Sequence, residues 1–229
     1  MVNTGTLDIS VVIPTLDAGA TLSATLEMLG GVEEIIVVDG GSRDGTQDVA
    51  IRHGARFVRA AKGRGYQLAA GADLARSEWL LFLHADTHLE PGWKSAVTDF
   101  IASPPNKERA AAFSFTLDDM SPQARRLEWI VALRTRTLGL PYGDQGLLIH
   151  RDLYTAVGGY PAWELMEDVD LVRRIGRKRL VILAIAANTS AFRWKQEGWF
   201  TRSARNLFCL SLYYLNVPPR LIARIYGSS

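Results

Sequence analysis

Apolar and β-branched residues form two continuous runs near the N-terminus, and each run ends at residues that break a strand. The first run covers residues 8–14 and ends on proline, and the second covers residues 34–41 and ends on a glycine pair. Such runs are typical of strands that are buried on both faces of a sheet. Residues 21–29 and 46–53 have helical apolar spacing, so this part of the chain predicts a β-α-β-α order.

The same alternation continues to about residue 86. Strand candidates at 56–59 and 79–83 are separated by the helix-compatible residues 66–75. Strands joined by helices predict a parallel sheet with crossover helices, in which ligands bind beyond the carboxyl ends of the strands. Polar clusters follow three of the predicted strands: Thr15-Leu16-Asp17, Asp39-Gly40-Gly41-Ser42 and His84-Ala85-Asp86.

The pattern of the second half is different. Strands are predicted over 110–117, 145–150 and 180–186, and helices over 123–138 and 167–177. This order predicts α+β structure on the same sheet or beside it. The sequence has no repeat of 20–50 residues and no low-complexity tract, which excludes a solenoid or a long linker.

Composition limits the class of protein. A chain of 229 residues with 48% hydrophobic and 22% charged residues predicts one domain, with room for a small appendage. We expect no signal peptide, and no apolar stretch reaches the roughly 20 residues that cross a bilayer. The single cysteine, Cys209, excludes an internal disulfide and a thiolate metal cluster, and we expect it to be a small buried side chain.

The net charge of +2 hides an asymmetry along the chain, because acidic residues dominate before residue 120 and basic residues dominate after it. A basic second half suits an anionic partner such as a phosphate-bearing substrate or a lipid surface. The basic residues are scattered and form no compact tract with interleaved aromatic residues, so we expect no nucleic-acid partner.

Each of the three strand-end clusters contains an acid, and two of them suggest a specific role. Asp39 precedes a glycine pair that a ligand can approach closely, and it could accept bonds from a base or a ribose; alternatively, it only caps the next helix. His84 and Asp86 share one face of a strand. Asp86 offers the hard oxygen that a divalent cation on a pyrophosphate needs. His84 could be a ligand, a nucleotide contact or a structural hydrogen-bonding residue.

Three further segments offer charged or polar side chains. The loop 62–67 places two cations before a helix and could bind a diphosphate, although a solvated basic loop has the same pattern. Residues 167–170 hold three acids, which either favour the helix dipole or include a general base for an acceptor hydroxyl. The tight polar turn 143–146 could border the same cleft.

Taken in order, these motifs resemble the family 2 glycosyltransferases of the GT-A fold, in particular a short bacterial subgroup with a Leu-His-Ala-Asp-Thr strand end and a Gly-Asp-Gln turn. The resemblance covers residues 8 to about 178. It implies an α/β fold: a GT-A type, Rossmann-like, nucleotide-binding mixed sheet flanked by helices, with a C-terminal helical extension. We therefore expect a catalytic domain at 1–190 and an amphipathic helical segment at 191–229.

The resemblance also implies roles for the candidate residues. Asp168 would be the base of an inverting displacement, with Glu167 beside it, and Asp86 would bind Mg²⁺ or Mn²⁺. The implied nucleotide-sugar site consists of Pro14, Thr15, Asp17, Asp39, Gly40, Gly41, Lys62, Arg64, Gln67, His84, Ala85 and Asp86. The residues expected on the acceptor side are Gly143, Asp144, Gln145 and Trp194.

The resemblance favours an enzyme that transfers one sugar at a time from a nucleotide-diphosphate sugar, because the Gln-x-x-Arg-Trp signature of processive synthases is absent. Two alternatives remain open. A sugar-phosphate nucleotidyltransferase typically has a glycine-rich basic loop after its first strand, where this chain has residues 14–17. A non-catalytic nucleotide-sugar binding module would keep Asp39 and would not need Asp168.

The segment from residue 192 to residue 226 combines aromatic, apolar and basic residues. From residue 181 onward the chain has six basic residues and one acid. This mixture is typical of an amphipathic helix on an anionic membrane, which predicts a cytoplasmic protein that binds the inner membrane face peripherally and uses a lipid-linked acceptor. Alternatively, the segment packs on the catalytic domain or on a second copy in a homodimer.

Overall fold

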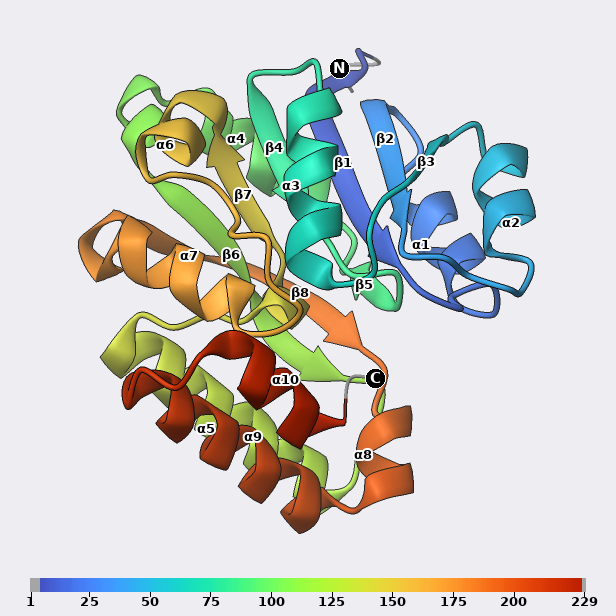
Figure 1. The fold of residues 1–229 in the computed structure, drawn as a ribbon. Helices are drawn as coiled ribbons and strands as arrows, with labels where there is room; N and C mark the ends of the chain where they lie inside the picture. Colours follow the sequence, from blue (N-terminus) through green and yellow to red (C-terminus); the bar gives the residue numbers. More distant parts are fainter. Residues whose placement is uncertain (1–4, 228–229) are drawn as a thin grey trace.

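Eight strands form one mixed β-sheet in the computed structural model, which describes residues 5–227 (Figure 1). The strands are β1 (Leu7–Thr15), β2 (Val32–Asp39), β3 (Arg56–Arg59), β4 (Trp79–Phe82), β5 (Thr87–Leu89), β6 (Ala110–Leu117), β7 (Leu147–His150) and β8 (Leu180–Thr189). Their order across the sheet is β3-β2-β1-β4-β7-β6-β8-β5. The expected α/β fold with a mixed sheet is therefore confirmed.

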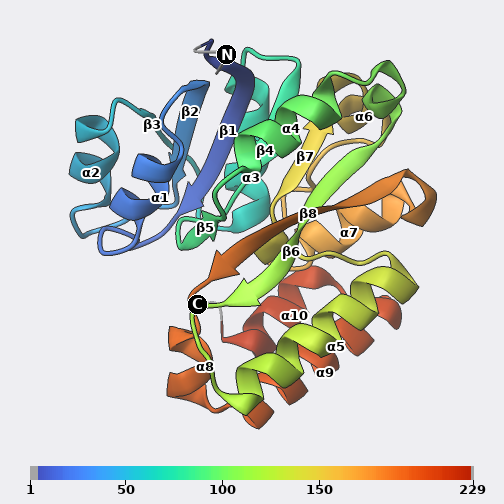
Figure 2. The ribbon, with the colours of Figure 1, turned by 180° about the vertical axis from the view of Figure 1, so that it is seen from behind.

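Helices cover both faces of this sheet (Figures 1 and 2). The α-helices are α1 (Leu22–Met28), α2 (Thr46–Arg52), α3 (Arg64–Leu74), α4 (Trp93–Ile101), α5 (Pro122–Leu138), α6 (Arg151–Ala156), α7 (Glu167–Ile175), α8 (Phe192–Glu197), α9 (Trp199–Tyr214) and α10 (Pro219–Tyr226). Three short 3₁₀ turns are η1 (Pro104–Glu108), η2 (Gly143–Gln145) and η3 (Arg177–Arg179). Helices α1, α2 and α4 pack on one face of the sheet, and α3, α6 and α7 pack on the other.

The alternation of side chains along β1 explains why its apolar run is continuous. Ile9, Val11 and Ile13 belong to the core under α1, whereas Val12 belongs to the core under α3. Successive residues of a strand point to opposite faces, so a strand with helices on both sides needs an apolar residue at every position. The prediction of strands buried on two faces is confirmed for β1.

Strand direction changes in the middle of the sheet. Strands β3, β2, β1 and β4 are parallel, as the first half of the sequence predicts. Strand β7 is antiparallel to both of its neighbours, β4 and β6, and β6 and β8 are again parallel, so β7 interrupts the parallel arrangement. The three-residue strand β5 has no sequence signal of its own and forms by pairing with β8, about 100 residues later in the chain.

The C-terminal helices lie below the sheet beside α5, as Figure 1 shows. Helices α9 and α10 bury Cys209, Tyr213 and Ile222 in a cluster with Leu165 and Val169, which flank the start of α7. The burial expected for Cys209 is confirmed. None of the helices in residues 5–227 is both long and apolar enough to cross a membrane. Residues 1–4 of the expected catalytic domain and residues 228–229 of the expected helical segment lie outside the described residues.

Helix α3 approaches β1 and β2 closely at Gly71. A Cβ atom at this position would lie 2.3 Å from Cγ1 of Val12 and 3.0 Å from Cγ2 of Val38. Both valines are fully buried, so they have no free space to move into.

We expect Gly71→Ala to lower the free energy of unfolding by about 1–3 kcal/mol, the range for overpacking a core, as measured by urea denaturation. Gly45→Ala is the control, because its Cβ meets no atom within 4 Å. Equal denaturation midpoints for the two variants would contradict this close packing.

Candidate active site

A cleft lies beyond the carboxyl ends of β1 and β4, where the parallel strands of the sheet end. Its larger part has a volume of about 840 Å³. Nine of the residues predicted for the nucleotide-sugar site line it: Pro14, Thr15, Asp17, Lys62, Arg64, Gln67, His84, Ala85 and Asp86. Residues from three separate segments of the sequence therefore meet at one edge of the sheet.

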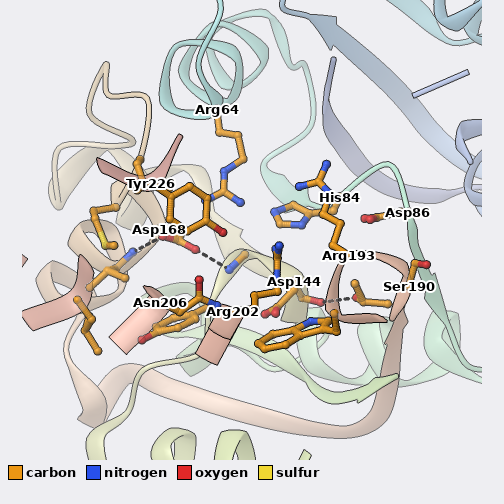
Figure 3. Close-up of a pocket in the computed structure, with 18 residues that line it drawn as sticks. Arg64, His84, Asp86, Asp144, Asp168, Ser190, Arg193, Arg202, Asn206 and Tyr226 are labelled. Atoms are coloured by element: carbon orange, nitrogen blue, oxygen red, sulfur yellow. Dashed lines mark hydrogen bonds between the residues drawn. The ribbon is translucent and has the colours of Figure 1, made fainter. Parts of the chain in front are cut away.

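A smaller cavity of about 160 Å³ adjoins this part, and Figure 3 shows the side chains around it. Arg64, His84 and Asp86 line both parts, so they form a shared wall. The predicted acceptor-side residues Gly143, Asp144 and Trp194 line the smaller cavity, as does the predicted base, Asp168. The two halves of the predicted site are thus contiguous in space.

Asp168 lies in the first turn of α7. Its Oδ2 accepts a hydrogen bond of 2.9 Å from the backbone N–H of Gly143, and its Oδ1 accepts one of 2.8 Å from the N–H of Val169. The preceding Met166 has a positive φ of 67°, which costs free energy for a non-glycine residue and is common near functional sites. A Cβ on Gly143 would lie 2.7 Å from Nε2 of His84, so only glycine lets the turn approach this imidazole. The carboxylate is fixed from two sides.

Glu167, next to this base, does not line either part of the cleft. Its side chain is 1% exposed, and its Oε1 lies 2.8 Å from Nε of Arg64. Burial raises the pKa of Glu167 to about 7, although the charge of Arg64 opposes this shift. Burial disfavours the charge of Arg64, but the carboxylates of Glu167 and Asp168 outweigh it and raise the pKa of the guanidinium. Glu167 therefore positions Arg64 at the wall between the two parts of the cleft.

Burial and the positive charge of Arg64 lower the pKa of His84 to about 4, although Asp86 opposes them. The imidazole of His84 is consequently neutral at pH 7, and a neutral imidazole has one nitrogen that can accept a hydrogen bond or bind a metal. The side chain of Asp86 forms no hydrogen bond and no ion pair within residues 5–227. Both groups remain available to a ligand.

Asp144 is the third acid of the small cavity. Burial raises its pKa to about 6; Arg134 opposes this shift, and the charges of Asp168 and Asp86 add to it. Its Oδ1 is buried and has no hydrogen-bond partner in the described part of the chain. A divalent cation would relieve both the mutual repulsion of these carboxylates and the unpaired oxygen.

The candidate metal ligands fit a divalent cation that is bound partly by the protein and partly by water and substrate. Within residues 5–227 no group of three His, Cys, Asp or Glu side chains is arranged around one point. Hard cations such as Mg²⁺ often take one or two carboxylates and complete their shell with water and substrate phosphates. Asp86, with His84 or Asp144 nearby, meets this requirement for an ion that binds together with a diphosphate.

Asp39, Gly40 and Gly41 lie behind the cleft wall and do not line either part. The Asp39 carboxylate accepts hydrogen bonds of 2.9 Å from the N–H groups of Gly41 and Ser42, and a third of 3.1 Å from the Thr15 hydroxyl. Its oxygens thus stabilise the turn after β2 and tie it to β1. Asp39 does not cap the next helix, α2, whose N-cap is Gly45; the nearby Asp44 accepts a hydrogen bond from the N–H of Thr46, the first residue of that helix.

The Gln145 side chain points into the sheet rather than into the cavity. Its Nε2 donates to the Phe113 carbonyl at 2.9 Å, and its Oε1 accepts from the Thr135 hydroxyl at 3.2 Å. Gln67 lines the larger part, but its Nε2 is already bonded to the carbonyls of Thr15 and Val38. Both amides therefore hold backbone segments that carry neighbouring site residues.

Several cavity residues have no motif in the sequence. They come from the end of β8 and from α8, α9 and α10: Ser190, Arg193, Arg202, Asn206, Leu210 and Tyr226. The excess of basic residues after residue 181 is the signal in the sequence that points to this wall. That signal cannot identify which arginines face the cavity, because this depends on how α9 and α10 pack against α7.

The family model described as Glycosyl transferase family 2 matches residues 10–137. A PGL/p-HBAD biosynthesis glycosyltransferase of Mycobacterium tuberculosis is 38% identical over 91 residues, which are 35% of this chain and 36% of that protein. The matched region thus spans about a third of the length of this curated relative.

Two solved structures share the fold. Glucosyl-3-phosphoglycerate synthase from Mycobacterium tuberculosis, in complex with Mn²⁺, UDP and glucosyl-3-phosphoglycerate, matches with a TM-score of 0.52 and 22% identity, over 80% of this chain and 70% of that one. Mannosyl-3-phosphoglycerate synthase from Rubrobacter xylanophilus matches with a TM-score of 0.59 and 20% identity, over 84% and 75% of the two chains. These similarities establish the GT-A fold. Since the family model covers more than half of the chain, this chain belongs to glycosyl transferase family 2.

Proposed function

We propose that this glycosyltransferase moves a sugar from a nucleoside diphosphate sugar to an acceptor hydroxyl in a metal-dependent, inverting and non-processive reaction. The observation that carries the proposal is the position of two unlike carboxylates at one cavity. Asp86 has no protein partner, while Asp168 is held by two backbone N–H groups. Glycosyl transfer needs one carboxylate to hold a cation beside the leaving diphosphate and another to accept the proton of the attacking hydroxyl.

The larger part of the cleft suits the nucleotide. Its volume of about 840 Å³ is in the range of sites that enclose a cofactor-sized ligand. Thr15 and Asp17, at the end of β1, would contact the base and ribose, and Lys62 and Arg64 would contact the base or the diphosphate. The structurally similar synthase from Mycobacterium tuberculosis was crystallised with UDP-glucose and Mn²⁺, which supports a nucleoside diphosphate sugar and a divalent cation here.

Asp86 would hold the cation, with neutral His84 and Asp144 as further candidate ligands from the same cavity. When bound, a Mg²⁺ or Mn²⁺ ion supplies electrostatic stabilisation of the charge that grows on the leaving diphosphate. Arg64 adds a fixed positive charge on the same wall, because its pairing with buried Glu167 keeps it in place. The protein thus neutralises the donor side of the reaction.

Asp168 would accept the proton of the acceptor hydroxyl as the hydroxyl oxygen attacks the anomeric carbon. Its two backbone hydrogen bonds orient the carboxylate, and each oxygen keeps a lone pair for the proton. Attack from the face opposite the diphosphate inverts the configuration at that carbon. The family assignment sets aside the nucleotidyltransferase and the non-catalytic binding module that the sequence leaves open.

A thermal-shift screen tests the proposed donor class. We expect nucleoside diphosphates and nucleotide-sugars to raise the melting temperature more with Mn²⁺ or Mg²⁺ than without, since binding to the native state alone stabilises it. Nucleoside monophosphates are the control, because they lack the diphosphate that completes the metal shell. Equal shifts for diphosphates with and without the cation would contradict metal-dependent donor binding.

A membrane contact and a lipid-linked acceptor are further parts of the proposal. Large apolar side chains are exposed on the lower helices, namely Trp129, Ile130, Leu133, Leu138, Phe192, Phe200, Leu207, Phe208, Tyr214 and Leu215. Exposed basic residues such as Lys195, Arg220 and Arg224 accompany them. This combination suits the surface of an anionic bilayer.

Flotation with vesicles containing phosphatidylglycerol tests this contact. We expect the protein to float at low salt and to be released at high salt, because the attraction is partly electrostatic. The double variant Leu207→Ser, Phe208→Ser should lose binding without damage to the cleft, whereas removal of the whole segment would destroy a cavity wall. If the unaltered protein stays unbound at low salt, the exposed surface contacts protein and the acceptor is not presented on a membrane.

A further inference from the structure

The small cavity has two walls that differ in their polar side chains (Figure 3). The wall formed by the sheet, η2 and α7 presents three carboxylates: Asp86, Asp144 and Asp168. The wall formed by α8, α9 and α10 presents hydrogen-bond donors: Arg193, Arg202, Asn206 and Tyr226. The proposed reaction explains the carboxylates of the first wall. It does not explain the hydrogen-bond donors of the second wall.

Arg202 is the most constrained of these hydrogen-bond donors, and like Arg193 it lines both parts of the cleft. Its Nη1 lies 2.7 Å from Oε1 of Glu197, and its guanidinium carbon lies 5.1 Å from the ring centroid of Trp194. Its Nε is buried and has no hydrogen-bond partner within residues 5–227. One edge of a rigid, planar cation is therefore fixed, while a buried donor on the same group lacks the acceptor it needs.

Asn206 follows Arg202 by one helical turn, so both side chains lie on the same face of α9. The Asn206 side chain forms no hydrogen bond in the described part of the chain. Arg193, at the junction with the larger part of the cleft, forms neither a hydrogen bond nor an ion pair with any of residues 5–227. Arg193 is exposed and Asn206 is partly exposed, so both side chains can donate to acceptor oxygens of a molecule that enters the cavity.

We propose that the acceptor carries an anionic group, a phosphate or a carboxylate, which Arg202 and Asn206 bind while the acceptor hydroxyl faces Asp168. This inference rests on the proposed function. A planar guanidinium binds two oxygens of such a group at once, which fixes orientation as well as position. The carboxylates of Asp144 and Asp168 disfavour an anion beside them and can accept the hydroxyl, so the two walls together set which end of the acceptor reaches the anomeric carbon.

Isothermal titration calorimetry with glycerol 3-phosphate and glycerol tests the inference, with UDP and Mn²⁺ saturating the donor part. We expect glycerol 3-phosphate to bind and glycerol not to bind. Arg202→Gln should weaken glycerol 3-phosphate about tenfold or more, the range for a lost charge-assisted hydrogen bond, and should change UDP affinity far less. Arg202→Lys keeps the charge but not the planar guanidinium, so its affinity for glycerol 3-phosphate should lie between those of the unaltered protein and Arg202→Gln.

Arg205→Gln is the matched control. Arg205 also pairs with Glu197, stacks on Tyr226 and has a buried Nε without a partner in the described part of the chain, but it lines neither part of the cleft. This variant should leave both affinities close to those of the unaltered protein, and equal losses in the two variants would overturn the inference in favour of a packing effect.

Other outcomes separate the inference from the function on which it rests. If UDP does not bind with Mn²⁺, the proposed function fails. If UDP binds and glycerol 3-phosphate does not, or if Arg202→Gln weakens UDP as strongly as glycerol 3-phosphate, the anionic acceptor subsite is wrong. Lysophosphatidic acid carries the glycerol 3-phosphate group on a lipid. If the protein binds it more tightly than glycerol 3-phosphate, the acceptor is a lipid; if the protein binds it more weakly, the acceptor is a small molecule.

Discussion

Replacement of Asp168 by asparagine is expected to lower the rate of sugar transfer by roughly 10²–10⁴-fold, the range for removal of a general base. The amide has nearly the same shape but cannot accept the proton of the attacking hydroxyl. The affinity for the nucleotide-sugar should be retained, because the residues proposed to bind it lie on other elements of the cleft. Initial rates at saturating donor, together with UDP affinity from calorimetry, measure the two effects separately.

The surroundings of Asp168 require two controls. Both carboxylate oxygens accept backbone hydrogen bonds, so the amide loses one of them and the variant should be destabilised by about 1 kcal/mol. The melting temperature shows whether that loss is the main effect. Asp170→Asn is the matched variant, since Asp170 lies in the same turn but pairs with Arg174 and does not line the cavity. Near-normal transfer by Asp168→Asn would refute its role as the base.

Asp86→Ala is expected to abolish the enhancement of UDP binding by Mn²⁺ while leaving the fold intact. The side chain makes no hydrogen bond or ion pair within residues 5–227, so its removal costs no contact in the protein. The variant instead removes the carboxylate oxygen that a divalent cation would share with the diphosphate. Calorimetric titration of UDP with and without Mn²⁺ measures the enhancement directly.

Asp99→Ala supplies the charge-matched control for this variant, because Asp99 is exposed on α4 and lies outside the cleft. It should keep the full Mn²⁺ effect. A Mn²⁺ effect of unchanged size in Asp86→Ala would remove Asp86 from the metal site and favour Asp144, whose buried Oδ1 has no partner in the described part of the chain.

Several of the residues that the sequence identified at the cleft directly follow apolar strands. Thr15 and Asp17 follow β1, and His84 and Asp86 follow β4, its parallel neighbour in the sheet. Parallel strands end at the same edge, so a run of apolar residues followed by polar ones is enough to predict their proximity. Asp39 obeys the same rule but stays outside the cleft, because its own turn supplies hydrogen-bond donors to its carboxylate.

Residues in turns show where this reasoning stops. Asp144 and Gln145 are adjacent, and both were expected on the acceptor side. The structure directs Asp144 into the cavity and Gln145 toward the Phe113 carbonyl of β6. In a tight 3₁₀ turn, neighbouring side chains diverge, and the direction of each depends on the strands beneath the turn.

The sequence by itself determined the α/β order, the parallel first half of the sheet and the strand-end acids, because hydrophobic period and strand-end polarity are local properties of the chain. Only the tertiary structure decided how the site is completed. The burial of Tyr213 and Ile222 against Leu165 brings α9 and α10 to the first turn of α7, and with them Arg202 and Asn206 to the cavity. That wall depends on packing between segments far apart in the chain, and no local pattern encodes such a distance.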